Sequence, residues 1–114
     1  MESMQSDEAP VIAERRYFVE DAVVLTVKIF LPYHEPPGDY KCRYEISGRI
    51  NKAMSVIGID AIDAIDNAFW LIGTELTGLN ETMFNGKLHW EAADADRPIG
   101  LPTINGDKVP FKNY

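Results

Sequence analysis

The 114-residue sequence has few cysteines, few histidines and no long apolar run. Its single cysteine, Cys42, cannot form an intrachain disulfide, so we expect a reducing, cytoplasmic environment. One cysteine and two histidines are too few for a zinc site, and no loop has calcium-ligand spacing, so no metal is expected. No apolar segment reaches the ~18 residues that cross a membrane, and the N-terminus lacks a secretory signal. We therefore expect no membrane partner.

Positive charge is also scarce. Eleven lysines and arginines face eighteen aspartates and glutamates, which gives a formal net charge of −7. This balance argues against nucleic acid or an anionic membrane as the main partner, because both carry negative charge themselves. The same balance permits a basic protein partner.

Motifs of known catalytic sites are missing as well. The sequence has no Gly-x-Ser-x-Gly, no phosphate-binding loop and no Gly-x-Gly-x-x-Gly, so neither catalytic residues nor a cofactor are expected. Cys42 lies between Tyr40 and Tyr44 on an apolar row, where a buried thiol is inert. His89 beside Glu91 is either an acid–base pair or, as we favour, an exposed polar pair. The sequence favours a non-enzymatic role and leaves catalysis open.

Alternating apolar and polar residues predict an antiparallel sheet with one solvated face. The clearest alternation spans residues 40–50, and residues 22–31 place Val23, Leu25, Val27, Ile29 and Leu31 toward the core. Weaker patterns predict strands at 11–19 and 53–57, and a returning strand at 87–91 with Leu88 and Trp90 inward. The proline-rich stretch from Pro32 to Asp39 is expected to be a loop.

One long amphipathic helix follows the predicted sheet. Asp60 is a suitable N-cap, and Gly78 or Asn80 can end the helix. Six apolar residues recur at three- and four-residue steps and predict its buried stripe: Ile62, Ile65, Phe69, Ile72, Leu76 and Leu79. The predicted class is α+β, an antiparallel sheet of four to five strands with one long helix packed across one face. We expect a disordered acidic segment at 1–10, a single α+β domain at 11–104 and a tail at 105–114.

Trp70 does not belong to the apolar stripe of the helix. At ~100° per residue it points away from that stripe, together with Asp63 and Asp66. Tryptophan is over-represented among binding hot spots, so these three residues are the predicted partner-binding site. Two alternatives stay open. A homodimer can use the same patch, or the C-terminal segment can cover it with Leu101, Ile104, Val109 and Phe111.

Two further surfaces are candidates for binding. A pocket between sheet and helix, lined by Tyr40, Tyr44 and Trp90, would suit a small molecule. The solvated sheet face, where Phe30 lies among basic residues, is a rival interface, and strand edges of two copies can also pair there.

Five short motifs give the chain a family resemblance. They are Cys42-x-Tyr44-x-Ile46, Gly58-Ile59-Asp60, Ile72-Gly73-x-Glu75-Leu76, Leu88-x-Trp90 and Gly100-Leu101-Pro102. Through them, residues 12–102 resemble a family of small bacterial domains of unknown function. The resemblance implies a bacterial, cytosolic α+β domain and supplies neither an activity nor a catalytic residue.

Size and charge decide the functional expectation. Some small acidic proteins act as immunity proteins beside secreted toxins, and the likeness is one of size and charge. The sequence therefore favours a non-enzymatic protein-binding module, immunity- or antitoxin-like, with a basic protein or a second copy of itself as partner. The alternatives are a small-molecule binder or enzyme with a sheet–helix pocket, and a structural homodimer.

Overall fold

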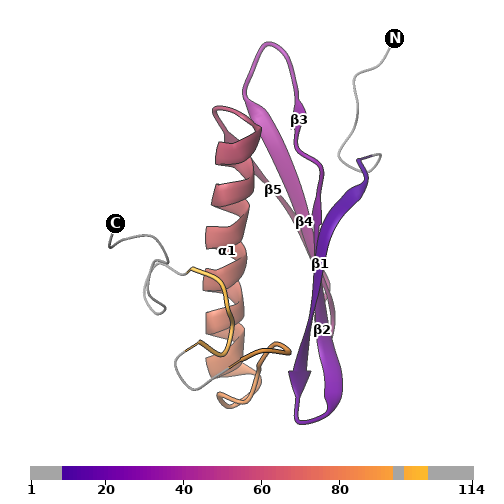
Figure 1. Cartoon of the computed structure of the whole chain (residues 1–114), viewed down its shortest axis with the longest axis vertical. Coiled ribbons are helices and arrows are strands. Elements are labelled where there is room, and N and C mark those ends of the chain that lie inside the picture. The colour runs from indigo at the N-terminus through magenta and orange to yellow at the C-terminus, as the bar shows by residue number, and fades with distance from the viewer. Residues whose placement is uncertain (1–8, 94–96, 103–114) are drawn as a thin grey trace. The chain divides into compact units, whose positions relative to one another are not determined.

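The computed structural model describes residues 9–93 and 97–102, which form an antiparallel sheet of five strands and one long helix (Figure 1). The predicted α+β class is confirmed. The elements in chain order are β1 (Val11–Val19), β2 (Ala22–Phe30), β3 (Tyr33–His34), β4 (Tyr40–Gly48), β5 (Lys52–Gly58) and α1 (Ala61–Thr82). Most of the predicted N-terminal segment at 1–10 and the whole predicted tail at 105–114 lie outside the described residues.

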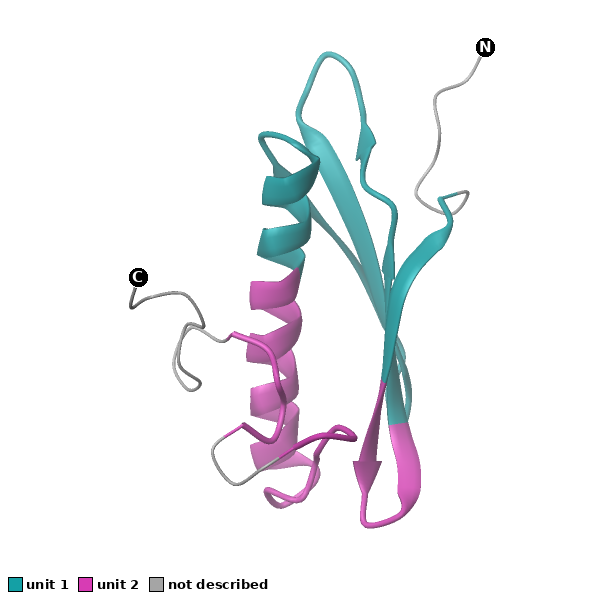
Figure 2. Cartoon of the chain, viewed as in Figure 1, with its two compact units in different colours: residues 1–15, 25–68 teal, residues 16–24, 69–114 magenta. Residues whose placement is uncertain are grey.

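The described residues divide into two compact units (Figure 2). The first unit comprises residues 9–15 and 25–68 and holds most of the sheet with the first turns of α1. The second unit comprises residues 16–24, 69–93 and 97–102 and holds the turn between β1 and β2 with the rest of α1. Each unit has buried side chains of its own, so each is described separately below.

Strand β4 is the centre of the sheet in the first unit. Tyr44 pairs with Ile29 of β2 and with Met54 of β5, so β2 and β5 lie along opposite edges of β4. The short strand β3 continues along the β2 edge, because Tyr40 pairs with both His34 and a β5 residue. The prediction of a continuous loop from Pro32 to Asp39 was therefore wrong at β3. Proline cannot donate to the ladder, but pairing resumes directly after it.

The alternation predicted for β4 is confirmed. Cys42, Tyr44 and Ile46 are fully buried, and the residues between them are partly exposed. In β2, the central residues Leu25, Val27 and Ile29 are buried as predicted, whereas two residues predicted as core, Val23 and Leu31, are exposed. Strand period predicts which face a side chain takes, but not how far along the strand the covering layer extends.

The start of α1 is fixed by reciprocal capping. The Asp60 Oδ1 accepts a hydrogen bond of 2.8 Å from the Asp63 N–H, which confirms Asp60 as the N-cap. In return, the Asp63 Oδ2 accepts one of 2.9 Å from the Ile59 N–H. Two backbone donors that a helix start leaves unsatisfied are thus paired.

The helix runs past both predicted end points to Thr82. Gly78 stays helical, and the Thr82 hydroxyl donates to its carbonyl. Asn80 does not cap the helix, because it organises the following turn instead. Its Oδ1 accepts from the Leu88 N–H at 2.8 Å, and its carbonyl accepts from the Gly86 N–H at 2.7 Å.

The buried line of α1 differs from the predicted stripe. The fully buried residues are Ala64, Ala68, Ile72 and Leu76, at four-residue steps. Ile62, a predicted core residue, is 78% exposed, and the other predicted stripe residues outside this line are partly buried. In the first unit the reason is a close approach between Gly58 and the backbone of Ala64. Two small residues bring the helix start against β5, and Ile62 is consequently turned outward.

The second unit contains no strand at 87–91, so that prediction was wrong. His89 instead forms an isolated antiparallel β-bridge to Phe18. The Phe18 N–H donates to the His89 carbonyl at 2.8 Å, and the His89 N–H donates to the Phe18 carbonyl at 3.0 Å. The neighbouring donors are used elsewhere: Asn80 accepts from Leu88, and the Pro98 carbonyl accepts from Trp90 at 3.1 Å. Leu88 is nevertheless buried as predicted, and Trp90 is partly buried.

Candidate functional site

The most unusual surface of the first unit lies where β5 turns into α1. Ile59 is 83% exposed and Ile62 78% exposed, although isoleucine is among the residues most often buried in proteins. Ile57, at the end of β5, is 57% exposed. We call Ile59 and Ile62, with the acidic residues Asp60, Asp63 and Asp66 between and beside them, the isoleucine end.

Hydrogen bonds hold the isoleucine end in one conformation. The cap between Asp60 and Asp63 fixes the backbone of Ile59. One turn further along α1, the Asn67 Nδ2 donates to the Ile57 carbonyl at 2.9 Å and ties the helix to the strand. A partner would therefore meet side chains on an ordered backbone, which reduces the entropy lost on binding.

Two of the predicted partner-binding residues belong to the isoleucine end. Asp66 is exposed, whereas Asp63 is partly buried and its carboxylate serves the cap. With the exposed Asp60 they give the isoleucine end three acidic residues within seven positions of the chain. An apolar centre with an acidic rim can bury isoleucine against a partner and pair with its lysines or arginines.

Trp70, the third predicted partner-binding residue, lies in the second unit and is partly buried. Three residues further along the helix, residues 101–102 pass directly over Gly73. A Cβ on Gly73 would lie 3.2 Å from the Leu101 Cβ and closer still to the Pro102 carbonyl. Leu101 therefore covers the helix at Gly73. Whether the C-terminal segment covers Trp70 stays a prediction, and Ile104, Val109 and Phe111 lie outside the described residues. The binding role of Trp70 stays a prediction.

The predicted pocket residues occupy different environments. Tyr44 is fully buried in the first unit. Tyr40 is partly buried, and its ring centroid lies 4.9 Å from that of His34. Trp90 lies in the second unit, where its Nε1 donates to the Arg97 carbonyl at 3.3 Å. The pocket that these residues would line stays a prediction.

A hollow of about 350 Å³ lies at the start of β5 in the first unit. Its lining includes the fully buried Ile46. The lining residues are Glu45, Ile46, Ser47, Asn51, Lys52 and Ala53.

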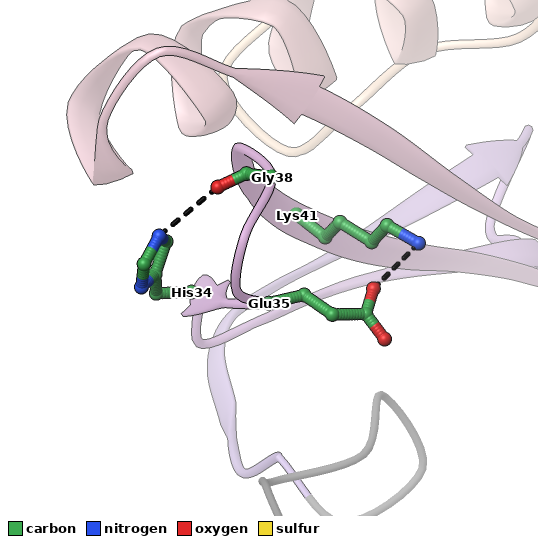
Figure 3. Close-up of polar contacts among 4 residues, drawn as sticks. All are labelled: His34, Glu35, Gly38 and Lys41. Carbon is green, nitrogen blue, oxygen red and sulfur yellow. Dashed lines mark hydrogen bonds and ion pairs between the residues drawn. The ribbon is translucent and has the colours of Figure 1, made fainter.

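Polar side chains between β3 and β4 close a turn (Figure 3). Because a carbonyl only accepts, the His34 Nε2 donates to the Gly38 carbonyl at 3.0 Å. The Lys41 Nζ lies 2.7 Å from the Glu35 Oε1, and this hydrogen bond, with the charge of Glu35, raises the pKa of Lys41. These groups hold the loop that contains Pro36 and Pro37.

The other histidine, His89, is engaged on two sides. Its ring stacks on Phe18 with a centroid separation of 5.9 Å. Its Nδ1 lies 3.1 Å from the Trp90 carbonyl, so Nδ1 carries the proton of that hydrogen bond.

Among the described residues, no group of three or more side chains from histidine, cysteine, aspartate and glutamate is arranged to hold a metal ion. No helix in residues 9–93 or 97–102 is long and apolar enough to span a membrane.

The thiol of Cys42 is expected to resist thiol reagents in the folded protein. It is fully buried, its Sγ lies 3.5 Å from the Phe30 carbonyl, and burial raises its pKa to about 11. Ellman's reagent at pH 8 should therefore label Cys42 only as fast as the chain unfolds, and at once in denaturant. The neutral thiol is favoured in the fold, so stability should fall as pH rises from its ordinary pKa toward 11. Rapid stoichiometric labelling without denaturant would contradict this prediction.

Sequence reasoning missed the exposed isoleucines, because Ile62 matched the helical stripe and was assigned to the core. A local signal was present. Ala64 and Ala68 recur four residues apart, and Gly58 precedes them at the end of a strand. Such small residues let two elements approach closely and thereby set which side of the helix is buried.

Comparison with known proteins gives a family but no described activity. No curated protein and no solved structure gives a significant match. A family model for a domain of unknown function matches residues 13–103, which include all of β2 to β5, the whole of α1 and most of β1. This match extends over most of the chain, and the predicted membership of a family of small domains of unknown function is confirmed. The protein therefore belongs to the family defined by the domain of unknown function DUF6968.

Proposed function

We propose that this protein is a non-enzymatic, cytoplasmic protein-binding module, immunity- or antitoxin-like, which binds a basic protein through the isoleucine end. The observation that carries the proposal is the exposure of Ile59 and Ile62, 83% and 78%, on a capped helix start. Exposed apolar clusters with a polar rim are typical of protein interaction sites.

The energetics favour a protein partner for this surface. Covering one isoleucine side chain contributes about 1.5–3 kcal/mol, and the free protein gains nothing from these two. The acidic residues around them would accelerate association with a positively charged surface and disfavour acidic competitors. The chain's net charge of −7 acts in the same direction.

The chemistry of the reactive side chains also supports a binding role. His34 and His89 are each hydrogen-bonded to a backbone carbonyl, and Cys42 is buried. These are structural uses of residues that otherwise serve as acids, bases or nucleophiles.

Ile62→Ser is expected to weaken partner binding by about 30-fold or more, the loss of roughly 2 kcal/mol at a central contact. The partner is first captured from a lysate of the source organism, then purified and titrated against wild type and variant. The matched control is Ile12→Ser, an exposed isoleucine of β1 in the same unit, which should leave affinity unchanged. Trp70→Ala is titrated in parallel.

Two outcomes would contradict the proposal. Equal affinity of Ile62→Ser and wild type would exclude the isoleucine end as the site. If Trp70→Ala alone lost binding, the partner would use the second unit instead. The captured protein must also be basic, since an acidic partner is incompatible with the rim.

A further inference from the structure

Among the described residues, β5 pairs with β4 alone, and its outer edge has little of the usual protection of an edge strand. Its seven residues pair with β4 in unbroken register from Lys52 to Gly58, without a bulge. They include no proline and one charged residue, Lys52, at the very start. Natural edge strands are normally blocked by bulges, prolines or charges near their middle, because an open edge pairs with other chains.

The backbone of β5 presents hydrogen-bonding groups on this outer edge. The Asn67 side chain reaches the Ile57 carbonyl from α1, which places that carbonyl on the side away from β4. This hydrogen bond uses one of the two acceptor positions of the carbonyl oxygen and leaves the other for a paired strand. In an antiparallel strand alternate residues direct both N–H and C=O to the same edge. Ala53 and Ser55 therefore share the outward direction of Ile57, and both are exposed.

We propose that β5 pairs with β5 of a second copy, antiparallel about a two-fold axis at Ser55, so that one sheet continues through both chains. Ser55 then lies opposite Ser55, and Ala53 lies opposite Ile57 of the second copy. The assembly stops at two copies, because each copy has used the outer edge of its β5 in the contact. The proposal goes beyond the hetero-partner of the isoleucine end, because it concerns the strand edge and does not require Ile62.

Charge favours a second copy as the occupant of this edge. The strand begins with a basic residue, Lys52, and is followed by the acidic Asp60 and Asp63. Antiparallel pairing at Ser55 places Lys52 opposite Gly58 of the second copy, two residues from its Asp60. It also keeps the two Lys52 residues at opposite ends of the paired strands, so that unlike charges meet and like charges do not.

Charge variants at Ser55 test this register directly. Sedimentation velocity of the full chain over a concentration series should give twice the 12.8 kDa chain mass for wild type. Ser55→Lys and Ser55→Glu should each weaken self-association by at least about tenfold, because identical charges then face each other. An equimolar mixture of the two variants should restore the dimer, because opposite charges then meet. Ala13→Lys and Ala13→Glu, exposed positions of β1, are the controls and should change nothing.

Three results would overturn the proposal: a 12.8 kDa species for wild type throughout the series, dimers that survive Ser55→Lys, or a mixture that stays monomeric. Circular dichroism is the control that checks whether each variant folds. The proposed function is judged separately. A monomeric Ser55→Lys protein that still binds the captured partner would retain the isoleucine end, and loss of partner binding in Ile62→Ser would leave the dimer intact.

Discussion

Gly58→Ala is expected to lower the free energy of unfolding by about 3 kcal/mol, the upper part of the range for overpacked sites. A Cβ at this position would lie 2.6 Å from the Ala64 Cα and 2.7 Å from the Asp63 carbonyl carbon, and closer still to the Ala64 nitrogen. All three atoms are backbone, so no side-chain rotation relieves the clash. The helix start cannot easily retreat, because the Asp60 cap and the Asn67 hydrogen bond tie it down.

Urea denaturation measures the free energy of unfolding of Gly58→Ala, and Gly78→Ala is the control variant. A Cβ on Gly78 would meet nothing within 4 Å, and the residue is helical and exposed. Gly78→Ala should therefore stabilise the protein by about 1 kcal/mol through helix propensity alone. If the two variants moved stability in the same direction, the close packing of β5 and α1 at Gly58 would be refuted.

Gly73→Ala is expected to release residues 99–102 from the second unit with a net loss of about 2 kcal/mol. Its Cβ would lie 3.1 Å from the Pro102 carbonyl carbon, a backbone obstacle. Releasing the segment exposes the fully buried Ile99, at a cost of about 1.5–3 kcal/mol. It also breaks the 2.6 Å hydrogen bond from the Tyr17 hydroxyl to the Ile99 carbonyl, worth about 1 kcal/mol. The higher helix propensity of alanine relative to glycine offsets about 1 kcal/mol of this loss.

Amide hydrogen exchange locates the effect of Gly73→Ala. The Trp90 N–H donates to the carbonyl of Pro98, the residue directly before the released segment, so its exchange should accelerate when the segment detaches and Pro98 loses its anchor. The Leu88 N–H, held by Asn80, is the internal reference and should keep its protection. Unchanged exchange at Trp90, or equal acceleration at both amides, would argue against local release.

Sequence patterns predicted the elements whose neighbours are local. In β4, strand period alone separates the buried Cys42, Tyr44 and Ile46 from the exposed face, because pairing on both edges leaves little freedom. The cap at Asp60 was equally predictable, since its partner is three residues away.

The errors arose where groups outside the element itself decide the outcome. The helix buries Ala64 in place of Ile62 because Gly58, outside the helix, lacks a side chain. Residues 87–91 alternate like a strand, but their donors bind the Asn80 side chain and the Pro98 carbonyl. The isoleucine end escapes prediction for the same reason, since the helical period places Ile62 among the core residues.

The hydrogen bond between Tyr17 and Ile99 has a consequence for synthesis of the chain. The two residues are separated by 82 positions, so the donor leaves the ribosome long before its acceptor exists. At roughly 5–20 residues per second, the nascent chain carries Tyr17 without this acceptor for about 4–16 s. Residues 25–68, by contrast, are made in one continuous stretch. Translation order therefore delivers the first unit's main segment early, and the second unit cannot complete its polar contacts until Ile99 has been made.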